Sequence, residues 1–494
     1  MVILNCFGLF ISASLFYVLH KVYKEYMLIK RMPPFWFYKH IPLIGSLAAF
    51  SWKQEELAFT ADEQFKKLGP IFSMKYFGMF VVFTGKFDIM KRMFVNNANF
   101  ASGRMRLPDF SFVEKKFLPS SGIATGSGLK WRLHKRLVTN TMTHLGYKSQ
   151  TFEAQVLNEA DTLIKSLYET GQSPVYPYYY FANAVCNMLC LLCFGRTFDV
   201  NDPRFHQLCT ASEDLLSGGF QTDIQYVYPF EWMAWFPFLK KERVCRKLRG
   251  FQEFANFINN EIEHHITNGL EDNNILDSML SAQSDSKITN PDIRAVIRDL
   301  IIAGLDTSTV ALLWTAKTLM VLPDVQEKVY AEIKTHLKDE QLSFSDRGKL
   351  HYTNAVLHEI LRYGCLVPML IPHVAENTFK IDNFIIPKGA MIFHNIWTVT
   401  RDPEAFKNPF DFDPNNFLDE NGHFEAHKEL TVFGIGQRSC VGERMANMEY
   451  FFIFVKMVTN FRLTAPPGKS YSIEDGNLGM TRAPTEFEVM FIPR

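Results

Sequence analysis

The alternation of apolar and polar positions along the chain predicts a mostly helical protein with a small β region. The longest regular helical pattern runs over residues 290–322. It begins at Asn290-Pro291-Asp292, a favourable helix start, and ends before Pro323. Further helical patterns cover residues 86–95, the region from 130, two periods within 150–200, and residues 324–338 and 354–363.

Strand-like patterns are short and fall in three parts of the chain. Residues 71–76 and 79–83 predict a hairpin around Gly78. Short strands separated by turns are expected over 366–400 and again over 465–494. The fold class indicated is therefore α+β, mainly α.

The N-terminal stretch has a different pattern, because residues 2–19 contain no charged side chain. As a helix, these residues would span about 27 Å, close to the thickness of a bilayer core. Lys21, Lys24, Lys30 and Arg31 follow, so the positive-inside rule leaves the rest of the chain in the cytosol. The pattern predicts an uncleaved membrane anchor over 1–20, a basic, proline-containing linker over 21–42 and one catalytic domain over 43–494. A cleaved signal peptide is the alternative, although a basic start and a clear cleavage site are missing.

Composition excludes several classes of protein. Lysine plus arginine and aspartate plus glutamate both number 52 in 494 residues, so no basic excess suggests nucleic-acid binding. The eight cysteines have no repeated paired spacing, which argues against a disulfide framework or a zinc ribbon. Cys186, Cys190 and Cys193 share one helix face and are expected in the core. The aromatic clusters of residues 201–250 fit either core packing or a surface resting on a membrane.

One short loop carries the most specific chemistry, Phe433-Gly434-Ile435-Gly436-Gln437-Arg438-Ser439-Cys440-Val441-Gly442. Helix-forming residues follow, so the loop brings a cysteine sulfur to a helix N-terminus. That position favours a thiolate, because it carries partial positive charge and free N–H groups. From the residues alone, Cys440 is a metal ligand, a nucleophile or a buried structural thiol.

Phe433, Gly436, Arg438, Cys440 and Gly442 resemble, position for position, the haem-ligand loop of the cytochrome P450 family. The resemblance extends over essentially the whole chain and is greatest to the microsomal animal branch. It implies a cytochrome P450 fold with haem b as cofactor. Cys440 would be the axial thiolate, and Arg438 would bind a haem propionate.

The stretch Ala303-Gly304-Leu305-Asp306-Thr307 resembles the oxygen-activation motif of the same family. Glycine, serine and threonine are costly inside a helix, so this stretch departs from local propensity as functional sites do. The resemblance implies that Gly304 leaves room beside the iron and that Asp306 and Thr307 provide a proton route. A threonine hydroxyl that bonds its own backbone can loosen the helix and hold a water.

Trp131, Lys135 and His373 match positions that bind haem propionates in the family. Lysine at 135 replaces the usual arginine, so it offers a cation without a bidentate fork. Together with the loop and the long helix, the expected haem contacts are Trp131, Lys135, Ala303, His373, Phe433, Arg438 and Cys440.

Glu359 and Arg362 resemble the E-x-x-R pair of the family, which has a structural role. Residues three apart on a helix can pair side by side. In the family an arginine commonly stands where this chain has Asn416. A third charged partner of the pair is therefore missing.

The resemblance implies a haem-thiolate monooxygenase at the endoplasmic reticulum membrane. It would insert one oxygen atom of O2 into an apolar fatty acid, steroid or xenobiotic. Electrons would come from NADPH through a partner reductase, with cytochrome b5 as a further donor and Lys130, Arg132, Lys135, Arg136 and Arg444 as candidate docking residues. The expected substrate-facing residues are Phe110, Phe112, Phe220, Ile302, Ala303, Val367, Leu370 and Met480.

Two alternative functions belong to other classes. A haem-thiolate isomerase or dehydratase would rearrange peroxides without a reductase, although Asp306 and Thr307 argue against it. A haem-based sensor or lipid-binding protein would have no turnover at all.

Overall fold

The computed structural model describes residues 2–36, 40–42, 45–46, 57–76, 78–104, 120–145, 150–199, 201–216, 242–271, 273–284, 288–337, 342–478 and 481–494. The chain divides into two compact units, each built from separated segments. The first comprises Met1–Met105, Met369–Val399 and Gly434–Ser439. The second comprises Arg106–Pro368, Thr400–Phe433 and Cys440–Arg494.

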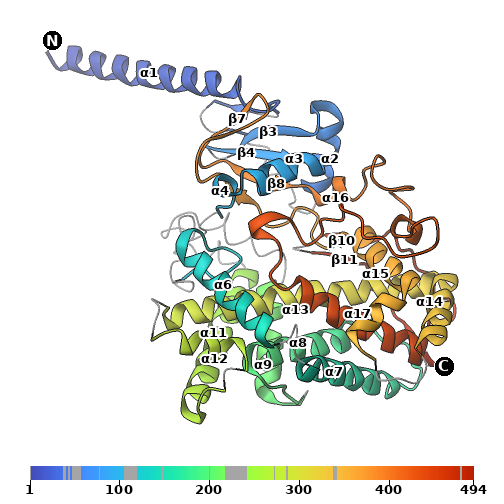
Figure 1. The fold of residues 1–494 in the computed structure, drawn as a ribbon. Coiled ribbons are helices and arrows are strands. Elements are labelled where there is room, and N and C mark those ends of the chain that lie inside the picture. Colours follow the sequence, from blue (N-terminus) through green and yellow to red (C-terminus); the bar gives the residue numbers. More distant parts are fainter. Residues whose placement is uncertain are drawn as a thin grey trace. The chain divides into compact units, whose positions relative to one another are not determined.

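A four-stranded sheet of order β3-β4-β8-β5 organises the first unit (Figure 1). Its strands are β3 (Ile71–Tyr76), β4 (Met79–Thr84), β8 (Met391–His394) and β5 (His373–Val374). Two-stranded pairs are formed by β1 (His40–Ile41) with β2 (Gly45–Ser46) and by β6 (Phe379–Ile381) with β7 (Phe384–Ile386). The helices are α1 (Val2–Ile29), α2 (Leu57–Leu68), α3 (Phe87–Lys91), the π-helix η3 (Arg92–Asn96), α4 (Ala98–Ala101), α16 (Ile396–Val399) and the 3-10 helix η9 (Gly436–Arg438).

The predicted hairpin is confirmed. β3 and β4 pair antiparallel from Ile71 opposite Thr84 to Tyr76 opposite Met79. Gly78 makes the turn with a φ of +79°, a value that glycine adopts without a steric penalty. Phe72 and Phe83 face each other across the pair with ring centroids 4.8 Å apart. These rings form part of the small apolar core of this unit.

Helix α1 runs to Ile29, beyond the predicted end of the anchor at residue 20. Within the described parts of the chain, none of the helices holds an apolar stretch long enough to cross a membrane. The predicted anchor is therefore not confirmed. The C-terminal part of α1 is linked to the sheet by an ion pair between Glu25 and Lys75, whose charged atoms lie 2.6 Å apart.

The second unit is predominantly helical. Its helices are α6 (Gly128–Leu145), α7 (Gln150–Tyr168), α8 (Tyr178–Phe194), α9 (Pro203–Leu216), α11 (Glu242–Asn268), α12 (Ile275–Ser281), α13 (Asn290–Val321), α14 (Pro323–His336), η7 (Phe344–Lys349), α15 (His351–Gly364), η8 (Pro414–Phe417) and α17 (Glu443–Asn460). Short strands β9 (Phe461–Thr464), β10 (Gly476–Leu478), β11 (Arg482–Pro484) and β12 (Met490–Pro493) pair as β9 with β12 and β10 with β11.

Helix α13 is the central element of this unit, and Figure 1 shows it crossing among the other helices. It packs against α8, α15 and α17. Thr289 and Asp292 form a capping box at its start, with Pro291 in the first turn, so two orphan N–H groups are satisfied. The helix predicted over 290–322 is confirmed.

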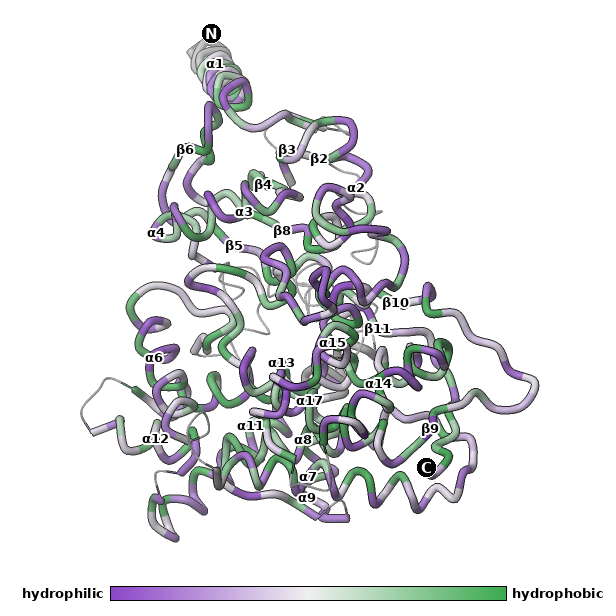
Figure 2. Tube along the Cα trace, turned by 45° about the vertical axis from the view of Figure 1, so that its right-hand side comes forward, coloured by the Kyte–Doolittle hydropathy of each residue, from purple (hydrophilic) through white to green (hydrophobic). Residues whose placement is uncertain are grey.

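The core of the second unit lies around α8. Cys186, Cys190 and Cys193 are fully buried there, which confirms that their spacing reflects packing rather than redox chemistry. Figure 2 shows hydrophobic and hydrophilic residues alternating along the surrounding helices. Such alternation gives each helix one face to bury against α8 and α13.

Candidate active site

Cys440 lies immediately before the N-terminus of α17, as the loop pattern predicts. Its backbone N–H donates to the carbonyl of Phe433 at 2.8 Å. The backbone N–H groups of Gly442 and Glu443 donate to its sulfur. The side chain is exposed, so the sulfur can be reached by a ligand.

The protein alone does not make Cys440 a stable thiolate. Surrounding protein raises the pKa of the thiol by desolvation, and the carboxylate of Glu443 adds to the increase. The hydrogen bond from Gly442 and the charge of Lys135 oppose this increase in the pKa but do not reverse it. A bound metal cation removes the proton from a thiol that coordinates it, so this arrangement suits a metal ligand.

The preceding part of the loop, Gly434–Ser439, belongs to the first unit. Gly436 has a φ of +75°, and a Cβ at this position would lie 2.1 Å from the carbonyl oxygen of Phe94. Only glycine therefore allows η9 to pack onto η3. Arg438 follows and donates from Nε to the carbonyl of Ser102 at 2.8 Å.

Arg438 lies beside Arg104 and His373 in a partly buried cluster of basic side chains. Arg104 donates to the carbonyl of Ile371 at 2.7 Å, and Nδ1 of His373 donates to the carbonyl of Ala101 at 2.6 Å. Burial lowers the pKa of Arg438 to about 9, although Glu376 opposes the change. Burial and the charge of Arg438 also lower the pKa of Arg104. Bound anions would relieve this repulsion.

Trp131 and Lys135 occupy the same face of α6 in the second unit. Trp131 is buried, and Nζ of Lys135 lies 5.8 Å from the centroid of its indole ring. Lys135 is half-buried and acts electrostatically on Cys440. The lysine that replaces the usual arginine is thus within electrostatic range of the cysteine.

Asp306 and Thr307 point in different directions from α13. The hydroxyl of Thr307 donates to the carbonyl of Ala303 at 2.7 Å, which is the backbone bond expected from the sequence. The carboxyl of Asp306 faces Thr481, and burial raises its pKa to about 6. One of its oxygens has no hydrogen-bond partner among the described residues. Ala303 is exposed on the same helix.

Gly304 has a packing role that the sequence interpretation missed. A Cβ at this position would lie 2.6 Å from Cδ2 of Leu189 on α8. Close packing of α13 against α8 therefore excludes a side chain there. The expectation that Gly304 leaves room beside the iron stays a prediction.

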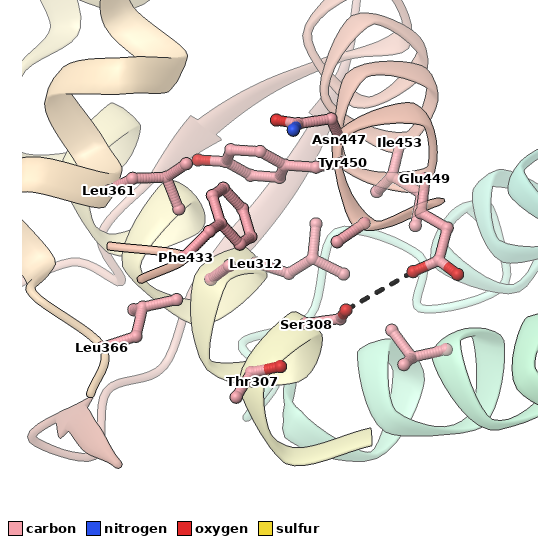
Figure 3. Close-up of a pocket in the computed structure, with 13 residues that line it drawn as sticks. Thr307, Ser308, Leu312, Leu361, Leu366, Phe433, Asn447, Glu449, Tyr450 and Ile453 are labelled. Atoms are coloured by element: carbon pink, nitrogen blue, oxygen red, sulfur yellow. Dashed lines mark hydrogen bonds between the residues drawn. The ribbon is translucent and has the colours of Figure 1, made fainter. Parts of the chain in front are cut away.

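A cavity of about 50 Å³ lies between α13 and α17 (Figure 3). Its lining includes Thr307, Ser308 and Phe433, and Glu449 on α17 accepts a hydrogen bond from the Ser308 hydroxyl at 3.4 Å. Figure 3 shows the Ser308 hydroxyl pointing toward this carboxyl. A volume of this size has room for roughly three to five water molecules.

Burial raises the pKa of Glu449 to about 8, although the hydrogen bond from Ser308 opposes the change. One oxygen of the carboxyl has no partner among the described residues. At neutral pH, Glu449 is therefore mostly protonated. Its O–H can donate into the cavity that Thr307 lines.

Replacing Glu449 by glutamine should stabilise the protein at neutral pH. The pKa of glutamate in an unfolded chain is near 4.5, whereas the pKa of Glu449 in the fold is about 8. Between these values the unfolded state holds fewer protons, so natural stability falls as pH rises. The gain at pH 7 should be of the order of 3 kcal/mol and should vanish below about pH 4.5.

Thermal unfolding across this pH range measures the effect. Exposed Glu263 on α11 provides the control, because Glu263→Gln should leave the pH profile unchanged. Parallel profiles for natural protein and Glu449→Gln would show that the buried carboxyl is ionised in the fold.

Glu359 and Arg362 form the expected buried ion pair. Both side chains are fully buried, and the guanidinium donates to both carboxylate oxygens at 2.7 Å. The remaining guanidinium hydrogens bind the carbonyls of Thr400, Pro409 and Asp411. The pair therefore holds residues 400–411 against α15.

Asn416 stands beside this pair, where the family commonly has arginine. Burial raises the pKa of Glu359, and Asn416 and Arg362 both oppose the change. Neither polar atom of the Asn416 amide has a hydrogen-bond partner of good geometry among the described residues. The backbone N–H of Asp413 donates to Glu359 at 2.6 Å instead and supplies a partner that the sequence does not reveal.

The expected substrate-facing residues fall only partly within the described parts of the chain. Ile302 is half-buried and packs against the main core. Val367 is half-buried, and Leu370 contacts Gly434 within the first unit. Outside the described residues lie Phe110, Phe112, Phe220 and Met480.

Three residues of these clusters were missed by sequence reasoning, namely Arg104, Ser308 and Glu449. Their partners are distant in sequence, so local pattern gives no signal for Arg104 or Ser308. Glu449 did offer one, because a glutamate inside the apolar run of α17 is costly unless it has a partner or is protonated.

The described residues fit a haem in two respects. In the second unit, an exposed cysteine sulfur receives N–H donors at a helix start. In the first, two mutually repelling guanidiniums and a histidine form a cluster suited to carboxylates. Trp131, Lys135 and Phe433 in the second unit, with Arg438 and His373 in the first, remain the predicted contacts.

Comparison with known proteins agrees with this fit. The family model described as Cytochrome P450 matches residues 33–491. Cytochrome P450 2U1 of Homo sapiens is 30% identical over 433 residues, covering 85% of this chain and 78% of that protein. Cytochrome P450 2C44 of Mus musculus is 30% identical over 473 residues, and cytochrome P450 2A13 of Homo sapiens is 29% identical over 471, each covering 92% of both chains. The chain therefore belongs to the cytochrome P450 family, whose members are monooxygenases that hold haem through a cysteine thiolate.

Proposed function

We propose that Cys440 is the axial haem ligand and that Arg438, Arg104, His373, Trp131 and Lys135 bind the haem carboxylates. The exposed sulfur at the start of α17 supports the first assignment. The buried cations support the second, because carboxylates would offset their repulsion. Ala303 and Phe433 complete the predicted contacts. When bound, the haem iron supplies the binding and activation of O2.

The chain's own residues supply protons to this chemistry. We propose that Thr307 holds a water through its hydroxyl oxygen, since its hydrogen is donated to Ala303. Neutral Glu449 donates a proton into the adjoining cavity. Asp306, with a pKa near 6, lies on another face of α13 and is the second proton source.

The substrate proposed is an apolar organic molecule such as a fatty acid, a steroid or a xenobiotic. Ile302, Val367 and Leu370 remain proposed contacts, together with residues outside the described ranges. The proposed substrate class rests on the apolar character of the residues at these positions. A fatty acid, a steroid and an apolar xenobiotic all match this character.

Electrons are proposed to come from NADPH through cytochrome P450 reductase, with cytochrome b5 as a further donor. Arg132 and Arg136 on α6 and Arg444 on α17 are exposed, as docking to an acidic partner surface requires. Lys130 is also exposed and pairs with Asp292 at 2.6 Å.

The proposed location is the endoplasmic reticulum membrane, with residues 1–20 as anchor, 21–42 as linker and 43–494 as the cytosolic catalytic domain. Phe10, Leu15, Phe16 and Leu19 on α1 are between 57% and 73% exposed. Apolar side chains at such exposure favour contact with lipid.

Labelled dioxygen tests the proposed function most directly. The protein is combined with reductase, NADPH and a substrate chosen by ligand-induced spectral shift from lipid and steroid libraries. A product containing one oxygen atom from O2 supports the monooxygenase. Peroxide rearrangement without NADPH would instead support an isomerase or dehydratase, and no turnover would support a sensor.

Replacing Thr307 by alanine should uncouple electron use from product formation. Without the hydroxyl, the water that it holds loses its position, and protons arrive by less ordered routes. The yield of product per NADPH consumed should fall at least about tenfold, and the yield of hydrogen peroxide should increase. A positioned proton donor usually contributes more than tenfold to a rate. Haem content should not change.

Measuring NADPH consumption, product and peroxide in one reaction gives the share of electrons that goes to product and the share that goes to peroxide. Thr335→Ala is the matched control, because Thr335 on α14 makes the same bond to its own helix, to Ala331 at 2.8 Å. Tight coupling in Thr307→Ala would exclude Thr307 from the proton route.

A further inference from the structure

A strip of three polar residues lies on one face of the β3-β4-β8-β5 sheet. Thr84 on β4 pairs with His394 on β8, and His373 on β5 pairs with Ile392 on β8. Paired residues face the same side of a sheet, as do residues two apart along one strand. Thr84, His394 and His373 therefore share a face, and all three are buried.

Stacking fixes the orientation of the two histidine rings. Phe94 on η3 stacks on His394 with centroids 3.6 Å apart and an interplanar angle of 14°. Its edge meets His373 at 4.5 Å, and the two imidazoles lie 4.6 Å apart. Both His394 nitrogens and the Thr84 hydroxyl lack hydrogen-bond partners among the described residues. Such buried orphan groups are unusual without a functional reason.

The hydrogen bond of His373 determines which of its nitrogens carries a proton. A backbone carbonyl can only accept, so Nδ1 of His373 must donate to Ala101. In the neutral ring, Nε2 then has a lone pair and no hydrogen. A carboxylate also only accepts. His373 can therefore bind a carboxylate through Nε2 only after that nitrogen gains a second proton.

The pKa of His373 depends on the groups around it, and these lie on several elements that pack against its ring. Burial, Arg104, His394 on β8 and Arg438 on η9 lower its pKa well below the usual value, whereas the Ala101 carbonyl on α4 raises it. Phe94 on η3 carries no charge. Without an anion the ring is therefore neutral at pH 7, and a bound carboxylate would favour the imidazolium.

We propose that His394 is a positioning residue of the haem-carboxylate site: it holds His373 with Nδ1 committed to Ala101, so that His373 takes up one proton when it binds a haem carboxylate. This inference rests on the proposed haem site. His394 acts only through His373 and does not touch the reacting atoms.

Proton uptake gives haem retention a definite dependence on pH. Since His373 is protonated with haem and neutral without it, its contribution to retention is strongest at low pH and weakens as pH rises between the two pKa values. That contribution corresponds to a tenfold loss of haem affinity per pH unit within this window. Cys440 makes the opposite contribution, because its thiol loses a proton when the sulfur binds iron, and a variant without the His373 contribution shows the Cys440 contribution alone. Above the pKa of the haem-bound state the dependence ends.

Haem transfer from the holoenzyme to excess apomyoglobin measures retention between about pH 5.5 and 8, where histidines titrate. His373→Gln retains only the Cys440 contribution, because an amide N–H binds a carboxylate without a second proton. The haem release rate of the natural protein divided by that of His373→Gln should therefore rise up to about tenfold per pH unit. A ratio that does not change with pH would overturn the inference.

Two substitutions of His394 separate positioning from space filling. His394→Ala removes the stack and frees His373 to turn, so the ratio of its release rate to that of His373→Gln should lose its dependence on pH. His394→Phe keeps the stack and should restore the one-proton dependence of this ratio, moved to higher pH because a neighbour that lowers the pKa of His373 is gone. The natural profile in His394→Ala would refute the positioning role.

The reduced carbon-monoxide spectrum of each holoenzyme is recorded first. A natural protein without haem or without the thiolate-type band would contradict the proposed function itself. A haem-loaded natural protein with that band, whose release profile parallels that of His373→Gln, would contradict only the inference on His394 and His373.

Discussion

Replacing Cys440 by serine is expected to abolish the red-shifted absorption of the reduced carbon-monoxide complex, together with monooxygenase activity. The hydroxyl does not ionise as the thiol does, and it cannot supply the electron density that a thiolate gives to iron. The hydrogen bonds from Gly442 and Glu443 would remain for the oxygen. The fold should therefore survive with its chemistry lost.

The matched control for this substitution is another cysteine of the same unit. Cys209 on α9 is half-buried, so Cys209→Ser should leave the absorption band and activity unchanged. Spectra of both variants at equal protein concentration give the comparison. An unchanged band in Cys440→Ser would exclude Cys440 as the ligand.

The sequence alone predicted elements whose signals are local. The start of α13 follows from Pro291 and the capping residues Thr289 and Asp292, all within one helical turn. The β3-β4 hairpin follows from alternation around Gly78. In both cases the determining contacts join residues less than about fifteen positions apart, so pattern carries the information.

Contacts distant in sequence were not predictable in this way. The sequence pointed to His373 and Arg438, yet it did not reveal that Arg104 lies beside them or that His394 stacks next to His373. Strand register brings His394 next to Thr84, 310 positions earlier. No pattern along a single chain encodes such a register.

Gly304 has a second constraint that the resemblance to the motif does not reveal. A side chain at this position would meet Leu189 of α8, a contact set by helix packing. At Asn416 the structure likewise supplies a contact distant in sequence, because the N–H of Asp413 donates to Glu359 where the charged partner is missing.

Replacing Arg362 by methionine is expected to cause the largest loss of stability among these variants. The carboxylate of Glu359, fully buried, would lose its only cation within hydrogen-bond distance among the described residues. Three carbonyls between Thr400 and Asp411 would also lose their donor. Breaking a buried ion pair costs about 3–5 kcal/mol, a large part of typical domain stability. Little folded, haem-containing protein should accumulate.

Urea unfolding followed by circular dichroism, with haem content of the purified protein, measures this loss. A second variant, Glu359→Gln, keeps the fold accessible because its amide oxygen still accepts from Arg362, and because the guanidinium keeps its three carbonyl acceptors, so its cost should be smaller. The exposed pair of Arg204 and Asp202 is the control, and Arg204→Met should change stability by less than about 1 kcal/mol. Since Arg362 donates to both the carboxylate and the loop, its loss should exceed that of Glu359→Gln. Equal costs for Arg362→Met and Arg204→Met would mean that the buried pair does not hold residues 400–411 against α15.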